Sequence, residues 1–229
     1  GDQSDGAVAD HRSNHALRRV APGDRRARPR GRYLPRLRGV AAAARVPVRG
    51  VARERVAAHM TGYFETGFAL EEAEQQLVLR LTPSTFDDDR AWWAQALATL
   101  YWQRGDSAMA RAYADSALGP TRAQIAGAPN DPQLHGLIAL MYAYLGRAAD
   151  ARSEVQQSMA HVDRFSQQAY NRTNAAKMEL ALGNRDAAID HLAKVRGSGY
   201  HLTNGWLQVD PTFASLKGYP KFEQMLKGN

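Results

Sequence analysis

The chain has 229 residues, a formal net charge of +7 and no cysteine, which is enough length for one domain with a full core or for a smaller domain with a long tail. The lack of cysteine excludes disulfide bonds, thiolate metal sites and thiol nucleophiles, and it is typical of a reducing compartment. No apolar run approaches the ~18 residues that a membrane-spanning helix needs, and no signal-peptide pattern opens the sequence, so we expect a soluble, cytoplasmic protein.

Residues 1–57 differ in composition from the rest of the chain. The first 60 residues contain 14 arginines, no lysine and five acidic residues, a net charge of +9, whereas residues 61–229 carry a net charge of −2. Prolines interrupt every stretch that could become helical, at Pro22, Pro29, Pro35 and Pro47. We therefore expect a disordered tail that carries all of the excess positive charge.

Three interpretations of this arginine-rich tail stay open. The first is an arm that binds nucleic acid, because clustered arginines could neutralise several phosphates, at Arg25, Arg26, Arg28, Arg30, Arg32, Arg36 and Arg38. Tyr33 is the only aromatic residue nearby, whereas arms that stack on bases usually interleave several. The second is a plain disordered linker. The third is a frameshifted segment, since this composition is typical of GC-rich DNA translated in the wrong frame, and Met60 is then a nearby internal start.

From residue 58 onwards, apolar residues fall at helical spacing and a short signature recurs. A glycine is followed five residues later by an alanine in three places, and two of these glycines have a tyrosine four residues before them. The residues are Leu97, Tyr101, Gly105 and Ala110, then Tyr142, Gly146 and Ala151, then Gly183 and Ala188. We expect each glycine to end a helix in a left-handed conformation and each alanine to let the next helix pack closely. Glu179 replaces the tyrosine in the third unit.

These spacings match the tetratricopeptide repeat, in which two helices form each unit. The glycines are 41 and 37 residues apart, longer than the usual period of ~34 residues. We place the extra residues at the junctions, around 120–132 and 162–168, where loop or an extra helical turn is tolerated. An earlier, degenerate unit is expected over Tyr63, Gly67, Ala73, Leu77 and Pro83.

The predicted fold is all-α, a solenoid of antiparallel helix pairs similar to tetratricopeptide arrays, with a C-terminal helical cap. The units are expected at about 61–83, 91–120, 132–162 and 169–196, and the cap at 197–229. Asp210 before Pro211 favours a helix start, because the side chain can cap a helix whose first residue is preset by proline. The cap is expected to cover the apolar end of the array with Trp206, Phe213, Phe222 and Leu226, and a second ligand site is the alternative.

Three stretches carry a narrower resemblance: 81–90 (LTPSTFDDDR), 103–117 (QRGDSAMARAYADSA) and 205–213 (GWLQVDPTF). With these stretches the chain resembles the C-terminal tetratricopeptide regions of bacterial serine/threonine protein kinases and related signalling regulators. The resemblance implies a non-catalytic protein-interaction scaffold that is the docking or regulatory part of a larger protein. The chain begins at Gly1 rather than Met, in keeping with a fragment. No His-Arg-Asp or Asp-Phe-Gly motif occurs, so we do not expect kinase activity.

No motif in the sequence predicts catalysis, a metal or a cofactor. The histidines outside the tail lie at least ten residues apart, so none has the short spacing to another histidine that metal sites use. Asp87, Asp88 and Asp89 precede a helix, where negative charge favours the positive helix end. No Gly-x-Ser-x-Gly elbow is present, so nucleophilic catalysis is not expected.

The resemblance implies that the first helix of each pair lines a concave groove for a protein or an extended peptide. By register, the groove residues are Trp92, Gln95, Thr99, Trp102, Gln103, Gln133, Leu140, Tyr144, Tyr170, Thr173 and Lys177. Lys177 stands almost alone, so the set of basic and amide groups that clamps a C-terminal carboxylate in chaperone-binding members is not reproduced. Rings and amides suit an extended segment instead, and packing between helices is the alternative role for Trp92 and for Trp102. A nucleic-acid-associated regulator that binds through the basic tail is the alternative, although nucleic acid is not the expected partner.

Overall fold

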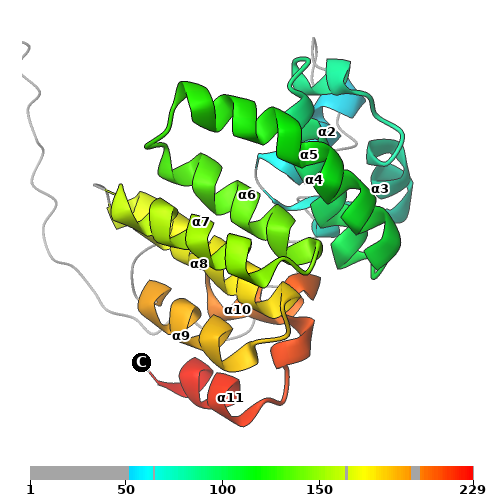
Figure 1. The fold of residues 1–229 in the computed structure, drawn as a ribbon. Coiled ribbons are helices and arrows are strands. Elements are labelled where there is room, and N and C mark those ends of the chain that lie inside the picture. The colour runs from blue at the N-terminus through cyan, green and yellow to red at the C-terminus, as the bar shows by residue number, and fades with distance from the viewer. Residues whose placement is uncertain (1–51, 64, 163–164, 197–201, 229) are drawn as a thin grey trace, which may run out of the picture. The chain divides into compact units, whose positions relative to one another are not determined.

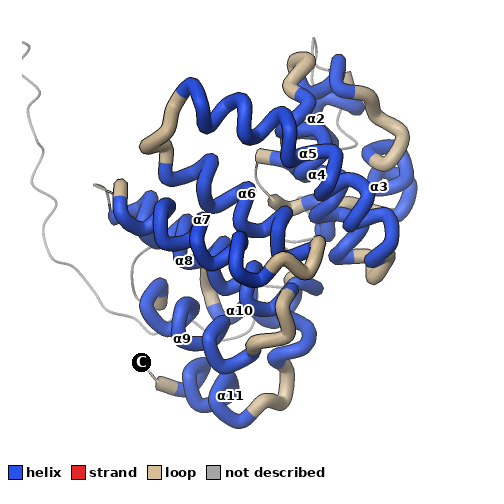
Figure 2. Tube along the Cα trace, viewed as in Figure 1, coloured by secondary structure: helices blue, strands red, loops and turns tan. Residues whose placement is uncertain are grey.

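The computed structural model describes residues 52–63, 65–162, 165–196 and 202–228, and every regular element within these ranges is helical (Figure 2). All of them fall within one of the two units of the chain, Tyr33–Asn229. The expected tail lies outside the described residues up to residue 51. Its last residues belong to α2 (Arg53–Gly62), so the helical region begins before residue 58. Burial of Ala57 and Ala58 explains this earlier start, because it holds α2 against the rest of the fold.

Six helices form three successive pairs (Figure 1). The pairs are α4 (Arg90–Gln103) with α5 (Ser107–Gly127), α6 (Pro132–Tyr144) with α7 (Ala148–Ala160), and α8 (Phe165–Ala181) with α9 (Arg185–Val195). A short turn reverses the chain within each pair, so the two helices pack antiparallel. Helices α5 and α8 also pack on α6, which is buried along most of its length. The expected all-helical fold built from helix pairs is thus confirmed.

The three turns within the pairs share one backbone geometry. Gly105, Gly146 and Gly183 have φ angles of 80°, 74° and 82°, which confirms the expected left-handed conformation. At the first turn, the Asp106 N–H donates to the Tyr101 carbonyl oxygen at 2.9 Å, and the other two turns repeat this bond. The turn therefore satisfies helix-end carbonyls in the way of a Schellman motif. The alanines five residues after the glycines are fully buried: Ala110, Ala151 and Ala188.

Aspartates begin three of these helices. Their side chains accept hydrogen bonds from backbone N–H groups of the first turn at 2.8 to 3.3 Å: Asp89 in α4, Asp106 in α5 and Asp131 in α6. This satisfies donors that no helical carbonyl can reach. The expected helix-start role is confirmed for Asp89. Asp87 and Asp88 instead form the turn before α4, with φ angles of 54° and 60°.

At the junction after the first pair, the extra residues are mostly helical. Helix α5 continues through Pro120 to Gly127, so much of the 120–132 insertion is helix. Proline removes one helical hydrogen bond, but tertiary contacts hold the added turns. Thr121 is fully buried, and its hydroxyl accepts a hydrogen bond from Gln95 of α4 at 2.8 Å. Periodicity along one helix does not report such a contact, so the sequence left open whether these residues form loop or helix.

The region before α4 contains a less regular helix pair. Helix α2 packs on α3 (Glu72–Val78), with two short 3₁₀ turns, η1 (Gly67–Ala69) and η2 (Pro83–Phe86), before and after α3. Gly67 begins η1 and is not among the described glycines with positive φ, and Tyr63 is 70% exposed. The earliest expected unit thus has a helix pair without the glycine turn of the other three.

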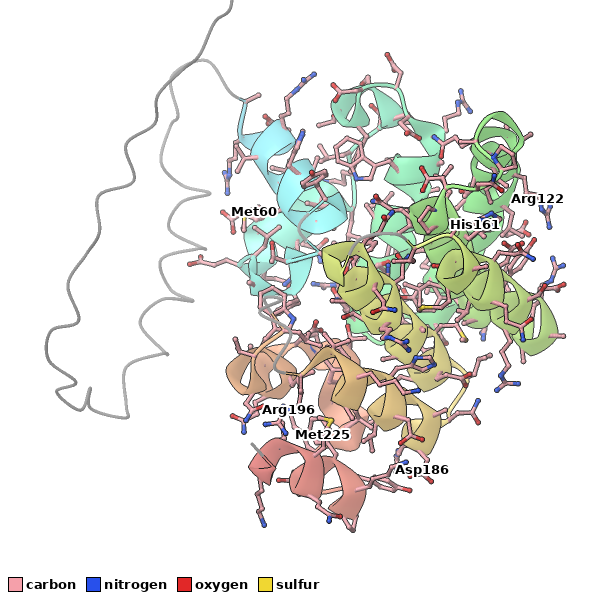
Figure 3. All side chains as sticks on the ribbon, turned by 90° about the vertical axis from the view of Figure 1, so that its left-hand side faces the viewer. Met60, Arg122, His161, Asp186, Arg196 and Met225 are labelled. Carbon is pink, nitrogen blue, oxygen red and sulfur yellow. The ribbon has the colours of Figure 1, made fainter. Side chains whose placement is uncertain are left out.

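The C-terminal cap consists of α10 (Asn204–Val209), η3 (Pro211–Leu216) and α11 (Pro220–Lys227). Phe213 and Phe222 are buried in one cluster with Leu192 of α9, so the cap covers the apolar side of that helix. Arg196 donates a hydrogen bond to the carbonyl oxygen of Leu226 in α11 at 3.3 Å. Figure 3 labels Arg196 and Met225, the residue before Leu226. No helix within the described ranges is long and apolar enough to cross a membrane.

The cap starts η3 as its sequence predicts. Asp210 accepts a hydrogen bond from the Thr212 N–H at 2.8 Å, and Pro211 occupies the first helical position. The element is a 3₁₀ helix rather than an α-helix. A second contact reaches much further along the chain, because Gln103 at the end of α4 donates to the Thr212 hydroxyl at 3.1 Å. The cap therefore also touches the first helix pair.

Candidate binding cavity

A cavity of about 830 Å³ lies among the first helices of the three pairs. Its lining comes from α4, α6 and α8, together with the end of α2, the end of α5 and the cap around Leu202 and Trp206. Eight of the predicted groove residues line it: Trp92, Gln95, Thr99, Gln133, Leu140, Tyr170, Thr173 and Lys177. We call this space the central cavity.

Three predicted groove residues lie outside the lining. Trp102 and Tyr144 stack on each other with ring centroids 4.7 Å apart, and Gln103 binds the cap through Thr212. Burial raises the pKa of the Tyr144 hydroxyl, and the charges of Glu65 and Asp210 raise it further, while a hydrogen bond with Thr99 lowers it. Trp102 and Tyr144 thus pack α4 against α6, and Gln103 links α4 to the cap. The central cavity therefore ends before Trp102 and Gln103 and is shorter than the groove that the sequence predicts.

Register arguments missed the contribution of the end of α2 and of the segment that follows it. Thr61, Tyr63 and Glu65 line the central cavity, although they lie outside the three main pairs. The helix-capping residues Asp89 and Asp131 also line it, and their position at helix starts was the available signal. Leu137 was detectable as well, because it lies four residues after Gln133 and therefore on the same face of α6.

A buried ion pair closes one part of the cavity wall. The Lys177 ammonium of α8 donates to the Glu65 carboxylate, and the Tyr170 hydroxyl donates to the other carboxylate oxygen at 3.3 Å. Glu65 has a φ angle of 54°, a conformation that is uncommon for a residue with a side chain. Burial lowers the pKa of Lys177, but the charges of Glu65 and Asp210 outweigh it and leave the pKa raised. Lys177 therefore stays charged and paired.

Trp92 lines the cavity at the start of α4 and packs against two other rings. The Trp92 ring contacts His59 and Phe86 edge to face, each with ring centroids 5.1 Å apart. Gly62 at the end of α2 lies directly against Trp92, since a Cβ built on this glycine would be 2.2 Å from the indole Nε1. The absent side chain at Gly62 thus makes room for the indole.

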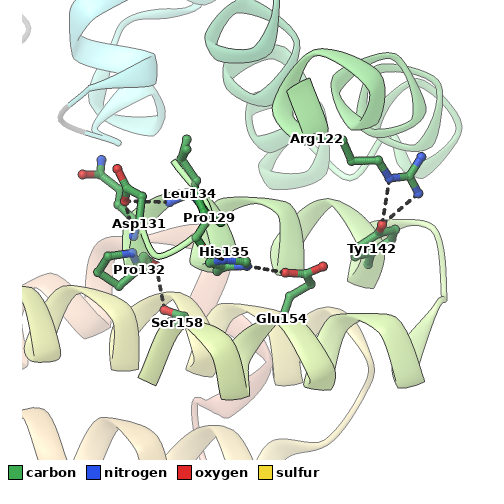
Figure 4. Close-up of polar contacts among 10 residues, drawn as sticks. Arg122, Pro129, Asp131, Pro132, Leu134, His135, Tyr142, Glu154 and Ser158 are labelled. Atoms are coloured by element: carbon green, nitrogen blue, oxygen red, sulfur yellow. Dashed lines mark hydrogen bonds and ion pairs between the residues drawn. The ribbon is translucent and has the colours of Figure 1, made fainter. Parts of the chain in front are cut away.

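The helix starts of α4 and α6 bring two carboxylates to the cavity. Asp89 also accepts a hydrogen bond from Gln124 of α5 at 3.0 Å. Asp131 uses Oδ1 for the backbone N–H groups of Gln133 and Leu134 (Figure 4). Its Oδ2 makes no hydrogen bond within the described residues.

The chemistry of the lining suits binding. Its carboxylates each have a structural task, since Glu65 pairs with Lys177 while Asp89 and Asp131 cap helices. Among the residues that the structure describes, no three histidine, aspartate or glutamate side chains gather in a way that could hold a metal ion. The cavity offers instead rings, amides and an apolar wall.

A second hollow of about 740 Å³ lies beside the turn between α8 and α9. Its polar groups are largely satisfied by one another. Arg152 binds Glu179, and the Tyr219 hydroxyl donates to Asp186 at 3.2 Å. The Arg185 guanidinium lies 5.8 Å from the centre of the Tyr219 ring. The central cavity is therefore the better candidate site.

Comparison of the chain with protein-family models, with curated proteins and with solved structures finds no match.

Proposed function

We propose that the chain is a non-catalytic protein-interaction module that binds an extended peptide segment in the central cavity. The observation that carries this proposal is the convergence of eight side chains, chosen by helix register within the resemblance to tetratricopeptide arrays, on one cavity between α4, α6 and α8. Convergent rings and amides are the groups that protein interfaces use to hold extended segments. The link to a larger bacterial signalling protein rests on the sequence resemblance.

The arrangement of polar groups supports binding of a backbone. Gln133 is exposed at the start of α6 and offers an amide that can both donate to and accept from a peptide. Trp92 and Tyr170 are half-buried, so each presents part of a ring to the cavity. Aromatic rings give large contact area at low entropic cost, and they commonly anchor peptide side chains.

The proposal is tested by selecting a displayed library of random decapeptides on the full-length chain. A second selection uses the Leu137→Trp variant, in which a larger ring is placed in the cavity from the half-buried middle of α6. We expect peptides that bind the wild-type chain and lose at least about tenfold in affinity for the variant.

The matched control is Met109→Trp. Met109 is a large apolar residue on α5 that is 37% exposed and lies outside the cavity lining. This variant should bind the selected peptides like the wild type, and circular dichroism should show unchanged helicity for both variants. If no peptide distinguishes the wild-type chain from folded Leu137→Trp, the central cavity is not the binding site and the proposal is wrong.

A further inference from the structure

We infer that the peptide bound in the central cavity carries one basic side chain, placed where α4 and α6 begin, with apolar residues beside it. This inference rests on the proposed function and adds the chemistry of the partner. It is carried by the charges and rings at that end of the cavity.

The cavity lining has more acidic than basic residues. Three carboxylates, Glu65, Asp89 and Asp131, face one cation, Lys177. Lys177 is 6% exposed and forms its ion pair with Glu65, so these two charges cancel locally. The remaining formal charge is that of Asp89 and Asp131, both at the helix starts.

The helix ends reduce this charge without removing it. A helix N-terminus carries roughly half a positive charge, so α4 and α6 together offset about one of the two negative charges. About one negative charge is left at this end of the cavity. A single basic side chain balances it, whereas two or more would leave excess positive charge.

The same end of the cavity has an acceptor and a ring that suit a basic group. Asp131 keeps Oδ2 without a partner among the described residues, and that atom can accept from a lysine or arginine. The Trp92 side chain lies one helical turn after Asp89, and indole faces attract lysine and arginine. Leu134 and Leu137 of α6 continue the lining with apolar surface, which suits apolar neighbours in the peptide.

An acidic segment does not fit this arrangement. The only cation among the described lining residues is Lys177, and a peptide carboxylate could reach it only by displacing Glu65. Breaking a buried pair in this way leaves Glu65 as an uncompensated charge. A carboxylate near the helix starts would be repelled by Asp89 and Asp131. The cavity thus discriminates between peptides of opposite charge.

The test is the composition of the peptides selected in the library experiment. We expect enrichment of one lysine or arginine flanked by apolar residues, and depletion of aspartate and glutamate. Acidic peptides that bind the arginines of residues 1–51 without using the cavity are recognised because they bind the folded Leu137→Trp variant equally well. Only peptides that lose affinity for this variant are counted.

Charge is then removed from the cavity while the helix caps are kept. Asparagine caps helices about as well as aspartate, and the Gln124 amide can turn its oxygen towards an asparagine at position 89. Asp131→Asn and Asp89→Asn therefore delete the charge with little effect on the fold. Each change should weaken the selected basic peptide about three- to fivefold. The same peptide with norleucine in place of its basic residue should bind both variants and the wild type equally. Asp106→Asn is the control, because Asp106 caps α5 outside the cavity.

The outcomes separate the two proposals. If the peptides that lose affinity for Leu137→Trp carry no basic residue, or carry acidic ones, the inference is wrong and the proposed function stands. The inference is also wrong if Asp131→Asn and Asp89→Asn leave the affinity of the basic peptide unchanged. If no peptide loses affinity for Leu137→Trp, the proposed function itself is wrong.

Discussion

The Arg152 guanidinium of α7 donates from Nε and Nη2 to the two carboxylate oxygens of Glu179 in α8, at 3.1 Å each. The preceding junction has a corresponding contact, because Arg122 of α5 donates to the Tyr142 hydroxyl of α6 at 3.2 and 2.8 Å (Figure 4). Glu179 and Tyr142 both lie four residues before a turn glycine. In each case an arginine from the second helix of one pair binds the first helix of the next. Glu179 therefore replaces the tyrosine of the repeat by offering another acceptor.

This correspondence predicts that a tyrosine can substitute for Glu179 better than a phenylalanine. The two replacements differ by one hydroxyl, which can accept from Arg152 as Tyr142 accepts from Arg122. We expect Glu179→Tyr to be more stable than Glu179→Phe by about 1 kcal/mol, measured by urea unfolding. In an Arg152→Ala background the two should be equal. A difference that persists without Arg152 would show that the hydroxyl has another role.

The turn glycines predict a backbone effect on stability. Gly146 has a φ angle of 74° and no atom within 4 Å of the position that a Cβ would occupy, so steric crowding does not contribute. We expect Gly146→Ala to lose about 1–2 kcal/mol of unfolding free energy, the cost of a left-handed residue with a side chain. Gly127 is the control, because it has the same open surroundings in an ordinary helical conformation. Gly127→Ala should be neutral or stabilising. Equal losses for both would contradict this explanation.

The contact between Gly62 and Trp92 predicts a larger, steric effect. A Cβ at position 62 would overlap the indole, so Gly62→Ala must displace either Trp92 or the end of α2. We expect a loss of about 1–3 kcal/mol in thermal or urea unfolding, together with a changed tryptophan fluorescence maximum. Gly205→Ala serves for comparison, since Gly205 is also helical and its nearest neighbour would be 3.7 Å away. An unchanged fluorescence maximum in Gly62→Ala would mean that the indole does not move.

His135 predicts a stability that falls as the pH rises. Burial lowers the pKa of His135, but hydrogen bonds to the Pro129 carbonyl oxygen at 2.9 Å and to Glu154 at 2.6 Å outweigh it and leave the pKa raised (Figure 4). Both ring nitrogens face acceptors, which favours the imidazolium. Its stabilisation is complete below the ordinary pKa and is lost as pH rises through the raised value. Urea unfolding of wild type and His135→Gln at about pH 5.5 and about pH 8 should show this loss only in the wild type.

His191 provides the opposite sign as an internal comparison. Burial lowers its pKa, and the nearby charges of Lys194 and Arg172 lower it further. Its Nδ1 is buried and makes no hydrogen bond within the described residues. The unfolded chain therefore binds this proton more readily, and the contribution of His191 falls as pH decreases through the ordinary pKa. His191→Gln should remove that loss at low pH and steepen the decline attributed to His135. The same pH profile in both variants would contradict these assignments.

The sequence alone determined the features that depend on short-range geometry. The glycine turns at 105, 146 and 183 and the helix start at Asp89 follow from backbone freedom and from a side chain that reaches its own helix. Such contacts span a few residues, so spacing predicts them. The all-helical fold of paired helices follows from the same periodicity, and helix register also identified most of the side chains from α4, α6 and α8 that meet in the central cavity.

Only the tertiary structure decided how that cavity is bounded. Glu65 pairs with Lys177 across 112 positions, and Gln103 binds Thr212 across 109. Register places Trp102 on the concave face, yet it stacks on Tyr144 outside the cavity lining. Periodicity specifies which face of a helix is apolar, but not which distant segment covers it. The covering depends on how the segment after α2 and the cap fold back, because these segments are held by contacts with helices far away in the sequence.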